Sequence, residues 1–180
     1  MELDLLDLYG RASEWTGAKV RGAVSHLDDP TTCDQWNVRA LLNHMLDTQR
    51  YFVGTAQGKD VTLSQDPPDL LGDDPGADFE HARAETLSTF GAPGVIDRTG
   101  PALGIAFSDQ LLHGWDVAVS TGQNATMPEG LPESAFAIIH GRFTDDQRKG
   151  VFKPEVVVDP SSSAQDKLLA YTGRNPSKAE

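Results

Sequence analysis

Apolar residues recur at every third or fourth position along most of the chain, a pattern typical of amphipathic helices. The spacing predicts a long first helix over residues 3–27. It predicts a second helix over 38–56, with Asn37 as its N-cap and an end near Gly58. Each helix is expected to bury its apolar face and expose its polar one.

Three further helices follow along the chain. The pattern predicts one over 77–90, a fourth over about 102–121 and a shorter fifth over 132–143. The stretch 58–76 is rich in Pro, Gly and Asp, so we expect a surface loop long enough to form a rim or lid. Residues 95–104 show no clear period, and we expect an irregular, short extended crossing there.

The C-terminal stretch differs in character from the helices before it. It contains a short β-like run, a Ser-rich turn and one short helix, which is too little for a separate domain. We therefore expect one domain over 1–180, with helices over about 1–145 and an arm over 146–180 packed on them. The predicted fold class is mainly α, an up-and-down four-helix bundle with a small C-terminal extension.

Composition limits the function classes. Acidic residues number 27 against 15 basic ones, and a formal net charge of −12 repels phosphate backbones and anionic lipids. Nucleic acid and membrane surfaces are therefore not expected as partners. Cys33 is the single cysteine, so neither an internal disulfide nor a Cys-rich metal site can form, and we expect it in the core or near a site. The acidic N-terminus lacks a signal-peptide pattern, so we expect a cytoplasmic protein.

Two carboxylates and an imidazole lie on one side of the fourth predicted helix. With Asp109 at zero, His113 falls at about 40° and Asp116 at about −20° around the axis, on the same side as apolar residues. A buried carboxylate needs a compensating partner, and a divalent cation would supply one to an Asp and a His at i,i+4. The alternatives are a hydrogen-bonded Asp–His pair, or a helix rotated so that the pair faces solvent.

The chain has five histidines, and those other than His113 are candidates for a third metal ligand beside Asp109 and His113. His44 lies at the edge of the apolar stripe of the second helix, where it is either a hydrogen-bonded core histidine or a ligand that points at the seam between helices. Two histidines and one carboxylate leave an open coordination position, which suits catalytic zinc and also iron, nickel or manganese. His26 suits a helix C-terminus, His81 is expected to be exposed, and His140 could be core or site rim.

Two motifs in this order resemble a known family. CDQWNVRALLNHML and DQLLHGWDVAVSTG resemble the metal-binding domain of mycothiol-dependent maleylpyruvate isomerase, within the DinB/YfiT-like metalloenzyme superfamily. The closing VFKPEVVV and DKLLAYTGRNP resemble the tail of its short, single-domain actinobacterial members. The likeness covers nearly the whole chain.

The resemblance implies a four-helix bundle that holds a divalent metal, zinc first and nickel second. It places metal ligands at His44, at Asp109, where the isomerase has Glu, and at His113. Asp116 then orients a ligand or acts as a catalytic base, and Trp115 is core. Members of the superfamily often form homodimers, so a homodimer is an expected partner.

The resemblance also implies a function. The metal would bind a low-molecular-weight thiol such as mycothiol or bacillithiol as its cosubstrate, and the thiolate would add to a small electrophile. The outcome is S-transfer or cis–trans isomerisation. The stretches 58–76 and 95–104 would shape the substrate pocket. For Arg98 and Arg142 there are two interpretations, contacts to anionic groups and, as the favoured one, exposed arginines without a role in the site. The alternatives are a metal-dependent hydrolase with Asp116 as base, and a non-catalytic metal-binding module.

Overall fold

The structure, a computed structural model, describes residues 4–33, 35–64, 66–149 and 151–179. The chain is mainly α-helical, and none of these described residues forms a β-strand. The α-helices are α1 (Leu5–Gly22), α2 (Val38–Ala56), α3 (Pro75–Gly91), α4 (Val95–Ser120), α5 (Leu131–Ile139), α6 (Asp145–Arg148) and α7 (Ala164–Tyr171), with 3₁₀ helices η1 (Val24–His26) and η2 (Pro176–Ala179).

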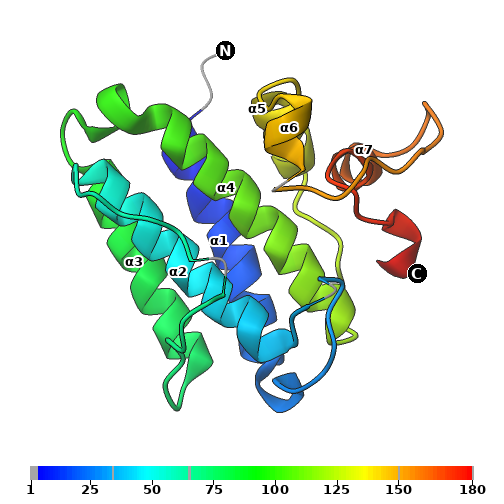
Figure 1. Cartoon of the computed structure of the whole chain (residues 1–180), viewed down its shortest axis with the longest axis horizontal. Coiled ribbons are helices and arrows are strands. Elements are labelled where there is room, and N and C mark those ends of the chain that lie inside the picture. The colour runs from blue at the N-terminus through cyan, green and yellow to red at the C-terminus, as the bar shows by residue number, and fades with distance from the viewer. Residues whose placement is uncertain (1–3, 34, 65, 150, 180) are drawn as a thin grey trace.

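The helices α1 to α4 lie side by side, and α5 and α7 lie beyond α4 (Figure 1). Contacts between elements show that α1 packs against α3 and α4, and that α2 packs against the same two helices. On the far side, α5 packs on α4 and α7 packs on α5. Helix α4 therefore has neighbours around most of its circumference, which explains why so many of its side chains are buried.

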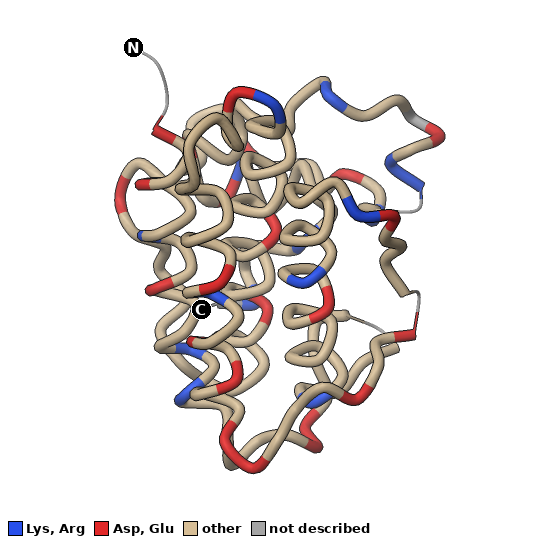
Figure 2. The backbone as a smooth tube through the Cα atoms, turned by 90° about the vertical axis from the view of Figure 1, so that its left-hand side faces the viewer, with Lys and Arg blue, Asp and Glu red and all other residues tan. Residues whose placement is uncertain are grey.

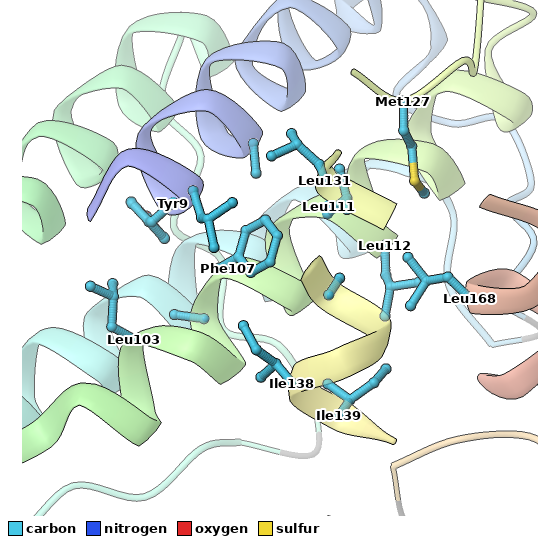
Figure 3. Packing of buried hydrophobic residues seen from close by; sticks show 14 of the residues in the cluster. Tyr9, Leu103, Phe107, Leu111, Leu112, Met127, Leu131, Ile138, Ile139 and Leu168 are labelled. Atoms are coloured by element: carbon cyan, nitrogen blue, oxygen red, sulfur yellow. The ribbon is translucent and has the colours of Figure 1, made fainter. Parts of the chain in front are cut away.

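The main apolar core lies where α1, α4, α5 and α7 meet (Figure 3). Phe107 and Leu111 of α4 contribute to it, together with Leu131 and Ile139 of α5 and Leu168 of α7, and all five are almost fully buried. A second cluster joins α2 to the ends of α1 and α3. The arm that carries α7 is thus part of the packed molecule.

The prediction of an irregular crossing over 95–104 was wrong, because these residues form the first turns of α4. Gly94, with φ of 71°, turns the chain into the helix, and the Thr99 hydroxyl donates to the Val95 carbonyl at 2.7 Å. Pro101 lies inside the helix. Its ring removes one backbone hydrogen bond, yet burial of Val95 and Leu103 keeps the segment helical.

Other boundaries differ by smaller amounts. The first helix ends at Gly22 rather than at residue 27 and is followed by η1, while Leu3 lies outside the described residues. Helix α3 begins at Pro75, because the Asp74 side chain accepts from the Ala77 amide and caps it. The fifth helix ends at Ile139 because His140 takes an extended conformation.

The β-like run in the arm is not a strand. Val157 is 96% exposed, and the Val156 amide donates to the Ala170 carbonyl without a strand partner among the described residues. A strand needs a neighbouring strand to satisfy its backbone groups, and this short run has none. The short helix expected after it is present as α7.

Candidate metal centre

Helices α2 and α4 bring three potential metal ligands together. His44 comes from α2, and Asp109 and His113 come from α4. One ligand atom from each lies within 4.8 Å of those of the other two. The Nε2 atom of His113 is 3.4 Å from Oδ1 of Asp109, and the rings of His44 and His113 meet edge to face with centroids 4.9 Å apart.

The local sequence explains this meeting. Asp109 and His113 are four residues apart, so they follow each other along one side of α4. On α2, Leu41 and Met45 point into the core and leave His44 at the edge of the apolar face. Direct packing of α2 on α4 then places His44 opposite the pair.

Polar neighbours hold the carboxylate of Asp109. The Thr48 hydroxyl donates to its Oδ2 at 3.1 Å, and Gln110 Nε2 lies 3.5 Å from the same atom. The His44 ring rests against Trp36 with centroids 4.6 Å apart, and its buried Nδ1 has no hydrogen-bond partner among the described residues. A buried nitrogen without a partner is unusual, and a ligand at this atom would satisfy it.

The other side of His113 is fixed by Asp116. Its Nδ1 donates to Oδ2 of Asp116 at 3.0 Å, since a carboxylate can only accept. Asp116 is 1% exposed and is held further by the Thr32 hydroxyl at 2.7 Å. Arg174 from the arm donates to both of its oxygens, from Nε at 3.0 Å and from Nη2 at 2.7 Å.

The electrostatics follow from burial and these contacts. Burial, reinforced by the charge of His113, lowers the pKa of His44 to about 4, so this imidazole is neutral at pH 7. Burial opposes protonation of His113, but the carboxylates of Asp109 and Asp116 raise its pKa well above 6.5. Burial likewise opposes ionisation of both carboxylates, yet His113 lowers the pKa of Asp109, and Arg174 lowers that of Asp116.

The candidate ligands lie in the wall of a cavity of about 640 Å³. The exposed area of its lining is more apolar than polar and comes from the turn before α2, from α2, from α4, from the end of α5 and from the arm, together with Leu63. Apolar side chains in that wall include Ile105, Leu112, Ile139, Phe143 and Phe152. The wall thus combines apolar surface with polar and charged side chains, a combination that suits a small-molecule site.

Some predicted contributors lie elsewhere. Arg98 and Arg142 are exposed and do not line the cavity, and Arg142 donates to the Ile138 carbonyl at 3.0 Å instead. Of the loop over 58–76, Leu63 alone among the described residues reaches the wall. The stretch 95–104 does not reach it, because it forms the far end of α4.

The remaining histidines and the cysteine can now be placed. His26 pairs with Asp29 at 2.7 Å, His81 is exposed, and His140 is exposed beside the rings of Phe136 and Tyr171. Cys33 lines the cavity, with its Sγ 3.9 Å from Oδ2 of Asp116.

Sequence reasoning missed Arg174 and Thr32. Both lie far from α4 in sequence, and neither forms a spaced motif with Asp116. One signal was available: a buried Asp on α4 requires a cation, and the Gly-Arg pair that follows α7 offers one.

Comparison with known proteins gives relatives but no activity. The chain is 25% identical over 186 residues to Uncharacterized protein Rv0738 of Mycobacterium tuberculosis strain H37Rv, and the match covers 96% of this chain and 98% of the relative. Uncharacterized protein MT0763 of strain CDC 1551 matches with the same values. No family model matches the chain, and no solved structure matches it.

Proposed function

We propose that the chain is a divalent-metal-binding protein that uses a low-molecular-weight thiol to act on a small electrophile, as an S-transferase or isomerase. The observation that carries the proposal is the cluster of His44, Asp109 and His113 in the wall of a largely apolar cavity. Two imidazoles and one carboxylate suit zinc or nickel and leave a coordination position open.

The residues fit such an ion in three respects. His44 has the neutral ring that ligation requires, and its Nδ1 is buried without a partner among the described residues. His113 presents Nε2 to the cluster while its Nδ1 is bound to a carboxylate, the arrangement usual for ligating histidines. Asp109 supplies a negative charge that the protein holds in place through Thr48.

A divalent cation at this position would keep a bound thiol in its thiolate form at neutral pH. The chain itself supplies the rest of the chemistry. Ile105, Leu112 and Phe152 give the cavity an apolar wall against which an electrophile would lie beside the ligands. Zinc is the first choice of metal, nickel the second, and mycothiol is a suitable thiol.

One observation favours thiol chemistry over hydrolysis. Metal-assisted hydrolysis is helped by a general base. The sequence offers Asp116 for that role. Its carboxylate already accepts from Thr32, His113 and Arg174, so it has little capacity left for a water molecule. Asp116 is better explained as the group that orients His113.

The arrangement of α1 to α4 supports the finer fold proposal, an up-and-down four-helix bundle of the DinB/YfiT type. The pairwise packing of these helices and the position of the candidate ligands between α2 and α4 are what such a bundle would give.

The experiment is metal content by elemental analysis on untagged protein after incubation with zinc. We expect close to one equivalent in the wild type and a large loss in His44→Ala and in His113→Ala. His81→Ala is the matched control, because His81 is exposed and outside the cluster. A wild type without metal, or variants that retain it, would overturn the proposal; if metal is bound, a thiolate charge-transfer band on adding mycothiol to the cobalt form tests the thiol.

A further inference from the structure

Among the side chains of the C-terminal arm that line the cavity, that of Arg174 contacts the carboxylate beside the candidate ligands. Arg174 follows α7, and its side chain is 15% exposed while that of Asp116 is 1% exposed. Its guanidinium spans both carboxylate oxygens, with Nε 3.0 Å from Oδ1 and Nη2 2.7 Å from Oδ2. Such a two-pronged pair fixes the plane of the carboxylate as well as its charge.

The backbone at the end of α7 sets the position of Arg174. The Arg174 amide donates to the Leu169 carbonyl and the Gly173 amide to the Ala170 carbonyl, each at 2.9 Å, which is a Schellman ending. Gly173 has φ of 77°, and a Cβ there would lie 2.6 Å from the carbonyl carbon of Lys153. Only glycine fits this turn, so Arg174 leaves the helix in one direction, toward Asp116.

The chain of contacts continues to the metal ligands. Oδ2 of Asp116 receives both Nη2 of Arg174 and Nδ1 of His113, the latter at 3.0 Å. With a proton held on Nδ1, the lone pair of the neutral imidazole lies on Nε2, which faces Asp109 and His44. Arg174 therefore touches no candidate ligand, yet it holds the residue that orients one.

We infer that Arg174 is a positioning residue for the metal centre and that docking of the C-terminal arm and metal binding are thermodynamically coupled. The inference rests on the proposed function. When the arm is docked, Asp116 holds His113 ready for an ion, and when an ion is bound, His113 in turn holds Asp116 against Arg174. Coupling of this kind is reciprocal, so each event favours the other by the same factor.

The test measures cobalt affinity by competition with a chelator, using the full chain. We expect Arg174→Gln to weaken binding by about 10–100-fold, the effect usual for groups that orient a ligand. Arg174→Lys keeps the charge but loses the two-pronged contact, so its cobalt affinity should fall between that of the wild type and that of Arg174→Gln. Lys167→Gln is the matched control, since it removes the same charge from an exposed position on α7 and should leave the affinity unchanged.

A double-mutant cycle separates positioning from loss of structure. Arg174→Gln alone leaves the buried carboxylate of Asp116 without its cationic partner, and Asp116→Asn removes that charge. In the Asp116→Asn background, Arg174→Gln should therefore change the cobalt affinity by no more than about threefold, because Arg174 acts on His113 through the Asp116 carboxylate. In the wild type, cobalt should slow hydrogen exchange in α7, and in Arg174→Gln it should not.

The outcomes are distinct. A wild type that binds no cobalt would overturn the proposed function and this inference together. A wild type that binds cobalt beside an Arg174→Gln variant of equal affinity would overturn the inference alone. So would equal effects of Arg174→Gln in both backgrounds, which would show that Arg174 acts independently of Asp116.

Discussion

At the residue scale, the chemistry of the site depends on His113, which lies between two carboxylates. Nε2 is 3.4 Å from Asp109 and Nδ1 is 3.0 Å from Asp116. When His113 is protonated, it and Arg174 balance the two carboxylates, so the charges of this largely buried group sum to zero. An ion at the cluster would replace the proton on Nε2 while the contact between Nδ1 and Asp116 remains.

This exchange predicts proton release on metal binding. His113 has a pKa well above 6.5 and is charged at roughly pH 7, whereas His44, with a pKa of about 4, has already lost its proton. Binding of zinc should therefore release about one proton, and the apparent affinity should rise with pH by up to about tenfold per unit until pH passes the folded pKa of His113. Calorimetry in two buffers of different ionisation enthalpy measures the release. An affinity that does not change with pH would contradict this account of His113.

At the element scale, α4 packs closely against α1, while Asp109 and His113 on its other side face α2. Gly114 lies on the opposite side of α4, and a Cβ there would be 2.7 Å from Cζ3 of Trp15 and in contact with the Thr16 hydroxyl. That hydroxyl donates to the Gln110 carbonyl at 2.9 Å, so it cannot move without losing its partner. The glycine between His113 and Trp115 is thus explained by helix packing.

We expect Gly114→Ala to lower the free energy of unfolding by about 1–3 kcal/mol, because α1 and α4 must separate to admit the methyl group. Gly91→Ala is the control: it is also helical, a Cβ there would meet nothing within 4 Å, and the change should be neutral or add up to about 1 kcal/mol. Chemical denaturation of both variants measures the difference. Equal stability of the two would contradict the packing role of Gly114.

The same scale shows what the sequence could predict. The apolar period located α2 closely, and the i,i+4 rule brought Asp109 and His113 together, because both depend on residues close in sequence. The start of α4 was missed because residues 95–104 show no clear apolar period, and tertiary packing keeps them helical despite Pro101. Arg174 was missed because its pairing joins segments 58 positions apart, and no local pattern records such a contact.

At the scale of the whole molecule, charge and metal binding have to be separated. Acidic residues are spread over the helices and their connections rather than gathered in one patch (Figure 2). With a net charge of −12, the chain attracts any cation weakly over its whole surface. None of the described helices has the length and apolar character needed to cross a membrane. Because of the acidic surface, stabilisation by a specifically bound metal must exceed that from the general attraction of cations, and it must depend on the cluster of His44, Asp109 and His113.

Thermal unfolding makes that distinction, since an ion that binds only the folded chain stabilises it by an amount that grows with the logarithm of the ion concentration relative to its Kd. At a free zinc concentration of about 100 times the Kd, the gain is about 2.7 kcal/mol, which for a chain of this size raises Tm by roughly 5–10 °C. We expect this shift in the wild type and its loss in His113→Ala. Magnesium at the same concentration serves as the control, because it binds surface carboxylates but rarely histidine. If magnesium raised Tm as much as zinc, or if zinc raised it equally in His113→Ala, the stabilisation would come from the acidic surface, and the cluster of His44, Asp109 and His113 would not be the binding site.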